Sequence, residues 1–338
     1  MNDSSSPAYT LSLRYSFYVA QGSILVLFNS LIFVSICYHR VLREKKELVL
    51  PAALAFVDTL EGLGCLLAGV GRNYLIYKGQ IGLLKTRWQC LLTPWNVVFI
   101  FSRQIFDSTL VAISFDRLVA VALPLVHFGL DRCYAFVLLA LAWGPPILMV
   151  PVIGFQTFET KNTTPDRSAL CFTSWVYVDW YKDFIYSART FLAAVSVLLY
   201  MVIILIYVCR KPPAGTNDDR NFKEYLKSER KLTLTLGISC IFTLVFYLGP
   251  VLVKAFIPPV QMTSLLGLDV IPYSYLVENI NRMANIFLYS LRHKQLKMGI
   301  FYLIIGKQLT EAQIKGNRVA DRVRTMKTSA LQLVIDYL

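Results

Sequence analysis

The stretch Ser114-Phe115-Asp116-Arg117-Leu118-Val119-Ala120-Val121-Ala122-Leu123-Pro124 decides the fold, because it sets an acidic-basic pair at the end of a long apolar run. That run begins near Leu91. An ionisable pair at the end of a membrane helix is costly unless it reaches water or finds partners. Pro124 cannot continue a regular helix. We therefore expect a membrane helix that ends here, at the membrane surface.

The composition is that of an integral membrane protein. Of the 338 residues, 56% are hydrophobic and only 16% are charged, and the mean hydropathy is +0.52. Soluble domains are nearer a quarter charged. The net charge of +13 would suggest a nucleic-acid partner in a soluble protein. In a membrane protein, Lys and Arg gather on cytoplasmic loops, so we expect contact with the lipid bilayer and no nucleic acid.

Seven apolar runs separated by polar segments predict seven membrane helices, because each is long enough to cross a bilayer. They are Tyr15–Tyr38, Leu48–Tyr77, Cys90–Pro124, Tyr134–Phe155, Asp183–Cys209, Leu232–Ile257 and Leu265–Leu291. A basic cluster follows the first run, which predicts an N-terminus outside the cell. Residues 292–305 alternate basic and apolar side chains, which is typical of a helix lying along the membrane surface.

These observations predict an all-α membrane protein of the plasma membrane. We expect an extracellular N-terminus over residues 1–14 and a seven-transmembrane helix bundle over 15–291. An interfacial eighth helix over 292–305 and a cytoplasmic tail over 306–338 would follow.

Several charged side chains fall inside the apolar runs, where they must face the bundle interior. They are Glu61, Arg103, Asp107, Arg189 and Glu278. One interpretation is a site whose fixed charges orient a polar ligand. The other is a closed network of internal salt bridges, because buried charges normally pair with one another. Arg103 and Asp107 are four residues apart, so they share a helix face and could pair within one helix.

Seven residues or short motifs occur along the chain in the order found in rhodopsin-like (class A) G-protein-coupled receptors, which they resemble. They are Asn29, Asp58, Asp116-Arg117, Trp143, Pro250, Asn285 and Tyr289. Asp116-Arg117-Leu118 resembles the Asp-Arg-Tyr signature of that family. Asn285-Ile286-Phe287-Leu288-Tyr289 resembles its Asn-Pro-x-x-Tyr motif, with Ile in place of Pro. The match extends to about Lys307, and its departures are similar to those of nematode serpentine chemoreceptors.

The resemblance implies a switch that couples an extracellular ligand to a heterotrimeric G protein, with arrestin as a further partner. Arg117 would pair with Asp116 at rest and turn toward Tyr200 and Tyr289 on activation, together with changes at Pro250 and Asn285. The alternative is that Asp116 and Arg117 merely cap a helix end at the interface.

The resemblance also implies a polar core, formed by Asn29, Asp58 and Asn281, that often binds sodium in the family; no other cofactor or metal is expected. For the ligand, alignment places Glu61, Arg103 and Glu278 below the outer opening. Arg189, Trp95, Phe99 and Tyr275 are further candidates. Phe99 stands where amine receptors carry an Asp, so a biogenic amine is not expected. Aromatic residues in an apolar bundle more often pack in the core than contact a ligand.

Cys90 and Cys171 are the two of seven cysteines expected on the outer face. The family has a disulfide here, and the outer face is oxidising; the alternative is two free thiols. Asn2-Asp3-Ser4 and Asn162-Thr163-Thr164 predict glycosylation at Asn2 and Asn162.

Two other function classes fit less well. A secondary transporter would use the intramembrane charges as a substrate path, yet the chain lacks paired, broken hydrophobic segments in two halves. A membrane enzyme would need a catalytic motif, and neither His-Glu-x-x-His nor Gly-x-Ser-x-Gly is present. We therefore predict a receptor and not an enzyme.

Overall fold

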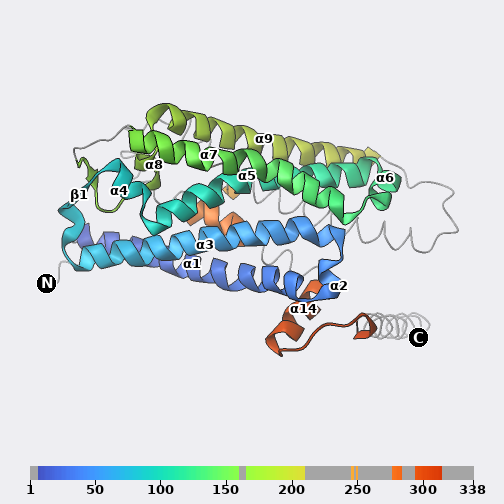
Figure 1. Ribbon diagram of the computed structural model, residues 1–338. Helices are drawn as coiled ribbons and strands as arrows, with labels where there is room; N and C mark the ends of the chain where they lie inside the picture. The colour runs from blue at the N-terminus through green and yellow to red at the C-terminus, as the bar shows by residue number, and fades with distance from the viewer. Residues whose placement is uncertain are drawn as a thin grey trace, which may run out of the picture.

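The computed structural model describes residues 7–159, 165–209, 245–246, 249, 276–283 and 294–313. Five long helices dominate this part of the chain: α1 (Pro7–Tyr38), α3 (Val49–Tyr77), α5 (Pro94–Ala122), α7 (Arg132–Glu159) and α9 (Asp179–Cys209). They lie lengthwise side by side, with α5 between the α1–α3 pair and the α7–α9 pair (Figure 1). The described residues thus form the expected helical bundle. The sixth predicted helix, apart from three residues, and most of the seventh lie outside them.

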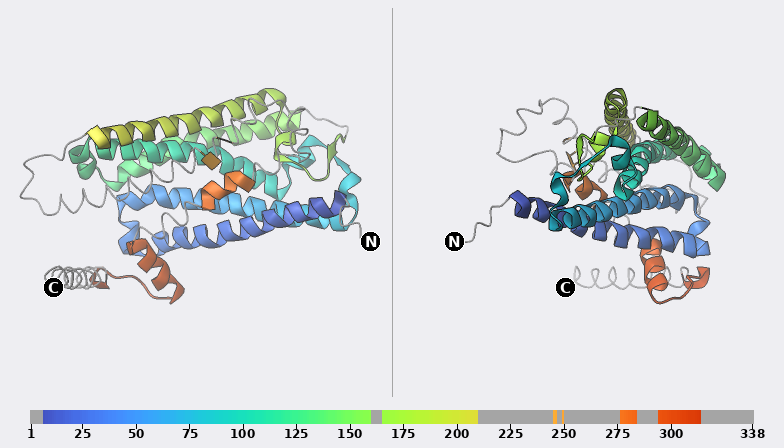
Figure 2. Two further views of the ribbon diagram at one scale, coloured as in Figure 1. Left: turned by 180° about the vertical axis from the view of Figure 1, so that it is seen from behind. Right: turned by 60° about the vertical axis from the view of Figure 1, so that its left-hand side comes forward.

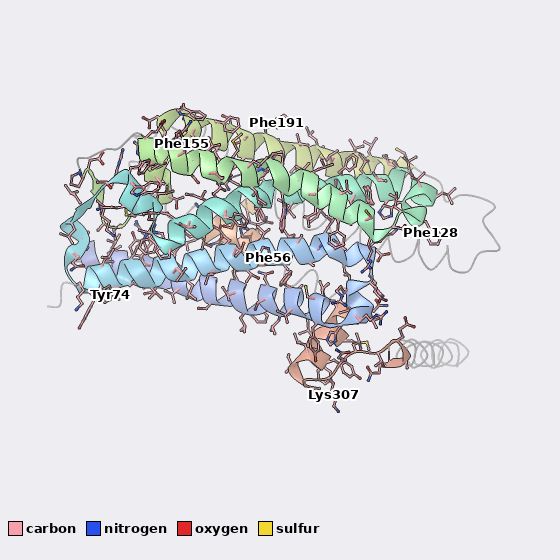
Figure 3. All side chains as sticks on the ribbon, viewed as in Figure 1. Phe56, Tyr74, Phe128, Phe155, Phe191 and Lys307 are labelled. Carbon is pink, nitrogen blue, oxygen red and sulfur yellow. A yellow bond between two sulfur atoms is a disulfide. The ribbon has the colours of Figure 1, made fainter. Side chains whose placement is uncertain are left out.

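Within the described ranges, four helices are long and apolar enough to cross a membrane, over Tyr9–Tyr38, Lys46–Tyr77, Arg132–Glu159 and Asp179–Ile206. Helix α5 has similar length but carries four charged side chains that lower its hydropathy. It can hold them because it packs against α3, α7 and α9. Helix α7, unlike α5, lies mostly at the surface of the bundle, since few of its residues are buried. Large aromatic side chains such as Phe155 and Phe191 point away from the bundle (Figure 3).

Close crossing of α1 and α3 depends on small residues, as is common between membrane helices. A Cβ atom at Gly22 would lie 2.6 Å from the backbone nitrogen of Leu66 and 2.7 Å from the carbonyl oxygen of Gly62. Neither atom belongs to a flexible side chain, so the two backbones could not keep this approach with a larger residue.

Several of the predicted helix boundaries differ from the structure, most of all at the start of the first helix and in the third apolar run. The first helix begins at Pro7 and not at Tyr15, so it overlaps the predicted N-terminal segment 1–14. Packing explains only the last residue of the added segment, since Arg14 is buried while Tyr9 and Leu13 are exposed. The third apolar run is broken near Thr93, so Cys90 lies in the short helix α4 (Arg87–Leu91) and not at the top of α5. Thr86 starts α4 with a capping box to Gln89.

One end of the bundle is closed by the segments around Cys90 and Cys171, and we call it the disulfide end. Here η2 (Gln80–Gly82) and β1 (Leu84–Lys85) follow α3, while β2 (Arg167–Ser168) and α8 (Thr173–Val176) follow α7. Strand β1 pairs antiparallel with β2, with Leu84 opposite Ser168. The two connections therefore form one cap.

The opposite end, which we call the Arg117 end, carries α2 (Arg40–Arg43), η1 (Lys46–Leu48), α6 (Pro124–Gly129) and α14 (Lys294–Ile304). Pro124 ends the α5 run as expected and begins α6, where its missing N–H costs nothing. The Lys46 ammonium donates to the carbonyl oxygens of His127, Phe128 and Leu130 at the end of α6. A single cation thus fixes the segment after α5 to the start of α3.

Two later segments contact the bundle. The helical residues 276–283 lie between the helices (Figure 2), and Gln21 of α1 donates to the Leu276 carbonyl at 3.1 Å. Helix α14 packs against α1 through His39, whose Nε2 donates to the Gly299 carbonyl at 2.8 Å. The Leu309 N–H donates to Nδ1 of the same ring at 3.1 Å.

Candidate functional site

A buried cluster of charge lies where α5 ends. Arg117 Nε donates to Asp116 Oδ2 at 2.9 Å, and its terminal nitrogen contacts the same oxygen. His127 Nε2, from α6, contacts the other carboxylate oxygen at 3.0 Å. All three side chains are buried, with Arg117 only 2% exposed. Asp116 therefore has a partner on each oxygen, and the third member of the cluster comes from the turn that Pro124 creates.

Helix α9 lies beside this cluster. Ser114 and Ser196 share a hydrogen bond of 2.8 Å between their hydroxyl oxygens, which joins α5 to α9 one turn before Arg117. Tyr200, one turn beyond Ser196, is buried at the same level of the bundle. The other predicted switch residues, Pro250, Asn285 and Tyr289, lie outside the described residues.

The polar core has an arginine at its centre. Arg282 Nη1 donates to Asp58 Oδ1 at 2.7 Å, and its guanidinium lies 3.6 Å from the Phe106 ring centroid. Asn29 donates to the Leu25 carbonyl of its own helix at 3.1 Å, and Asn281 is fully buried nearby in the sequence. A guanidinium already supplies the positive charge beside Asp58, so these residues do not fit a resident sodium ion. The sequence reasoning did not single out Arg282, although it lies within the last apolar run.

Two further ion pairs link helices nearer the disulfide end. Glu61 of α3 accepts from Ser102 at 2.7 Å and from Arg103 Nε at 3.0 Å. Arg189 of α9 donates to Asp107 at 3.1 Å, and its other nitrogen lies 3.9 Å from Glu278. These pairs run between helices, whereas the sequence spacing suggested a pair within α5. Glu278 was expected near Glu61 and Arg103, and its carboxylate also lies within 3.9 Å of Arg189 of α9.

Trp95 and Phe99 fill spaces made by glycines. A Cβ at Gly71 would lie 2.6 Å from the Trp95 ring, and one at Gly64 would lie 2.7 Å from the Phe99 ring. Both aromatic side chains are buried in the core near the disulfide end. Phe99 also supports the Arg103 guanidinium, which lies 4.2 Å from its centroid. Tyr275 lies outside the described residues.

The predicted disulfide between Cys90 and Cys171 is present. Arg72 of α3 holds the same loop, since its Nε donates to the Leu170 carbonyl at 2.9 Å and a terminal nitrogen donates to that of Cys171 at 3.3 Å. Asn96 of α5 donates to the carbonyls of Cys90 and Cys171, at 2.8 and 3.0 Å. A buried arginine and an amide thus position the cap over α3 and α5.

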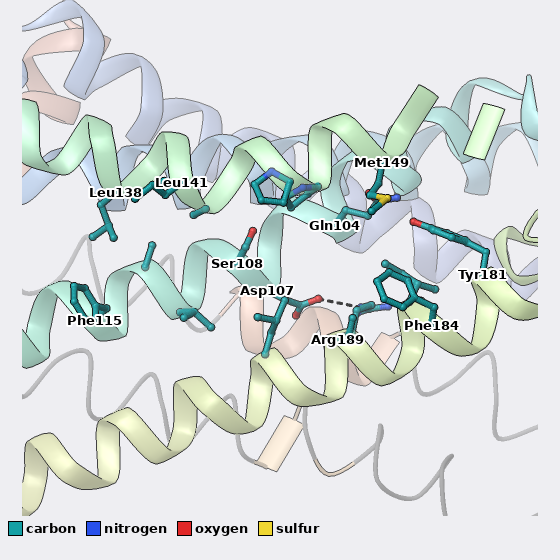
Figure 4. Close-up of a pocket in the computed structure, with 18 residues that line it drawn as sticks. Gln104, Asp107, Ser108, Phe115, Leu138, Leu141, Met149, Tyr181, Phe184 and Arg189 are labelled. Atoms are coloured by element: carbon teal, nitrogen blue, oxygen red, sulfur yellow. Dashed lines mark hydrogen bonds and ion pairs between the residues drawn. The ribbon is translucent and has the colours of Figure 1, made fainter. Parts of the chain in front are cut away.

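Two cavities lie on either side of Arg189. The larger, of about 590 Å³, lies between α5, α7 and α9 (Figure 4). The smaller, of about 10 Å³, lies under α8 and is lined in part by Arg103, Tyr177 and Arg189. It has room for about one water molecule. Across the described residues, no group of three or more His, Cys, Asp or Glu side chains is arranged to hold a metal ion.

The comparison with known families identifies the bundle. The family model of the serpentine type 7TM GPCR chemoreceptor Srv matches residues 95–266, about half of the chain, from the start of α5 onward. The chain belongs to the Srv family of serpentine chemoreceptors. No curated protein matches the sequence. Srv is a chemosensory receptor family of the GPCR type, and the nematode resemblance read from the sequence is confirmed.

Within this Srv chain, sequence reasoning missed two residues of the charged clusters. His127 did not stand out in the sequence, because its spacing of eleven residues from Asp116 gives no periodic signal. Arg282 lies four residues after Glu278 on one helix face. That spacing could have predicted that Arg282 faces the bundle interior, where it pairs with Asp58 of α3.

Outside the membrane-spanning helices, Arg40 donates to Glu44 at 2.7 Å, and this hydrogen bond lowers the pKa of the Glu44 carboxyl.

Proposed function

We propose that the protein is a chemosensory G-protein-coupled receptor that binds a ligand from the disulfide end and activates a heterotrimeric G protein at the Arg117 end. The observation that carries the proposal is the buried Asp116–Arg117–His127 cluster at the end of α5 opposite the disulfide, in a chain of the Srv family. In the proposed switch, activation moves this charged cluster into a second arrangement, as happens in two-state signalling elements.

Orientation follows from the chemistry of the two ends. Disulfides persist in oxidising compartments, so the Cys90–Cys171 end faces outside. The basic residues of α2 lie at the other end, in keeping with the positive-inside tendency. We propose seven spans in the plasma membrane with the N-terminus outside, and α14 as the interfacial eighth helix. Asn2 and Asn162 would then be glycosylated, and arrestin would share the Arg117 end with the G protein.

His127 makes the switch energetically feasible. When Arg117 leaves Asp116, a buried carboxylate would remain, and an unpaired buried charge is strongly unfavourable. The contact from His127 Nε2, at 3.0 Å, keeps Asp116 partnered in that state. Arg117 can then turn toward Tyr200 on the adjacent α9. Asn285, Tyr289 and Pro250 complete the proposed switch from the seventh and sixth helices.

At the disulfide end, a polar ligand would act by competing for paired charges. Arg103 and Arg189 line the small cavity under α8, and each already binds a carboxylate, Glu61 or Asp107. A ligand that binds one guanidinium releases its carboxylate and shifts α5 against α3 or α9. Glu278 would move together with Arg189. The aromatic side chains of Trp95, Phe99 and Tyr275 would pack around this ligand site.

The test is ligand-independent nucleotide exchange on a G protein in membranes that contain equal amounts of receptor. Arg117→Ala should abolish the exchange that the wild-type receptor supports, while surface expression stays largely intact. Arg132→Ala is the matched control, because Arg132 is exposed at the same end and donates to the Arg43 carbonyl. Equal exchange by wild type and Arg117→Ala would rule out the switch.

A further inference from the structure

The larger cavity lies at the lipid-facing side of the bundle and adjoins the small cavity under the cap at Gln104 and Arg189. Helix α7 forms one wall, and most of its side chains are exposed. Leu141, Phe115 and Phe184 line the cavity and are 70%, 43% and 49% exposed. In a membrane these side chains meet lipid tails, so the cavity is open to the bilayer between α5, α7 and α9. Its volume of about 590 Å³ falls within the range of small-molecule sites.

Two hydrogen-bond donors in this cavity have no partner among the described residues. Gln104 Nε2 and Tyr181 Oη are both buried without a hydrogen bond, and their residues are 5% and 2% exposed. Figure 4 shows both side chains at the end of the cavity near Met149, toward the disulfide end. Burying a donor without an acceptor is costly. Two such donors at one end of an apolar cavity indicate an acceptor that arrives with a ligand.

We propose that this cavity binds a single-chain amphiphile with an uncharged hydrogen-bond-accepting head group, which enters from the bilayer. Its hydroxyl or carbonyl oxygen accepts from Gln104 and Tyr181. Its hydrocarbon chain runs between α5, α7 and α9 toward Phe115 and Leu138, which lie at the other end of the cavity (Figure 4).

The chemistry of the cavity wall selects against a charged head. Both unpartnered donors are neutral groups, an amide and a phenol. The guanidinium of Arg189, which also lines the cavity, already binds Asp107 at 3.1 Å and lies 3.9 Å from Glu278. An anionic head would have to displace one of these carboxylates, whereas a neutral oxygen leaves the ion pairs intact.

The position of Arg189 connects this site to signalling. Gln104 and Arg189 line both the large and the small cavity. An amphiphile that fills the large cavity therefore contacts the same α5–α9 ion pair that a ligand under the cap would contact. Control of signalling by this site rests on the proposed function, but binding itself does not.

Binding can be measured directly on the full chain in nanodiscs, without a G protein. The probe is a tritiated C14 fatty alcohol that carries a diazirine in its chain, and cross-linked peptides are mapped by mass spectrometry. Labelling should saturate and should lie on α5, α7 and α9. Unlabelled tetradecanol should compete at least tenfold better than tetradecane, which lacks an acceptor, and better than tetradecanoate.

Three variants test the site. Tyr181→Phe and Gln104→Leu each remove one donor and should weaken probe binding about fivefold, the usual effect of one hydrogen bond. Both should raise the melting temperature of the ligand-free receptor, because an unsatisfied donor is gone. A merely structural role would lower it. Ala188→Phe fills the cavity and should abolish labelling, whereas Tyr74→Phe, at an exposed tyrosine of α3, should change nothing.

Equal competition by tetradecane and tetradecanol would overturn the proposal, as would stronger competition by tetradecanoate. Labelling that persists in Ala188→Phe would also overturn it. The two proposals fail separately. Arg117→Ala should retain full labelling while it loses nucleotide exchange, and a wild-type receptor that is labelled but supports no exchange would contradict the proposed function alone.

Discussion

The ion pair between Arg282 and Asp58 makes a strong prediction about the centre of the bundle. The two side chains are 4% and 1% exposed and 2.7 Å apart, so neither charge has access to bulk water. Arg282→Met keeps an unbranched apolar stem but removes the guanidinium, and it leaves the Asp58 carboxylate buried without its cation. Removing one partner of a buried pair costs about 3–5 kcal/mol. Loss of the guanidinium over Phe106 adds about 1 kcal/mol.

The expected loss of stability is therefore about 4–6 kcal/mol, obtained by adding the two contributions. At about 2 °C per kcal/mol for a chain of this size, the melting temperature should fall by about 8–12 °C. Thermal unfolding of the purified receptor in detergent measures this fall. The double variant Asp58→Asn with Arg282→Met should recover at least half of it, because no charge is then left buried.

An exposed pair of the same chemistry is the control. Arg40 and Glu44 are 2.7 Å apart but have side chains 80% and 48% exposed, so Arg40→Ala should leave the melting temperature unchanged. If Arg282→Met melted like the wild type, the pair would not be buried in the folded protein. A double variant less stable than Arg282→Met alone would refute the electrostatic reasoning, because the remaining carboxylate would then not be the cause.

The remaining predictions concern ions, packing and the cap. Exchange of NaCl for choline chloride should leave the melting temperature unchanged, since a guanidinium already lies against Asp58; stabilisation specific to sodium would contradict this. Gly22→Ala should cost about 1–3 kcal/mol, because its Cβ would lie 2.6 Å from a backbone nitrogen of α3. Gly154→Ala, with nothing within 4 Å, should be neutral or slightly stabilising, so equal melting of the two variants would refute the crossing argument. Cys171→Ser should cost about 2–5 kcal/mol in unfolding experiments, and a reducing agent should destabilise the wild type but not this variant.

Local features of the fold were predictable because they depend on nearby residues or on composition. Pro124 ends the α5 run because a proline within a helix removes a hydrogen bond and clashes with the preceding turn. Cys90 and Cys171 were the two cysteines expected in an oxidising compartment, and they form the disulfide. The order of the seven residues or short motifs along the chain gave the receptor family before any contact was known.

Contacts between distant residues were not predictable in the same way. Helical periodicity places Arg103 and Asp107 on one face, but the crossing of the helices decides that Arg103 meets Glu61 and Asp107 meets Arg189. His127 reaches Asp116 only because α6 folds back under α5. The break at Thr93 lies where Pro94 begins α5 and where the Thr93 hydroxyl donates to the Cys90 carbonyl at 2.7 Å, and hydropathy is insensitive to such hydrogen bonds. Unpartnered donors such as Gln104 and Tyr181 emerge only from the packed structure.

Membrane topology is the decisive measurement, because a receptor of this kind needs an outer disulfide end and an inner Arg117 end joined by an odd number of spans. Receptors tagged at either terminus would be stained with an impermeant antibody on intact and on permeabilised cells. We expect the N-terminal tag to be stained on intact cells and the C-terminal tag only after permeabilisation. Staining of both tags on intact cells, or of both only after permeabilisation, would contradict this expectation.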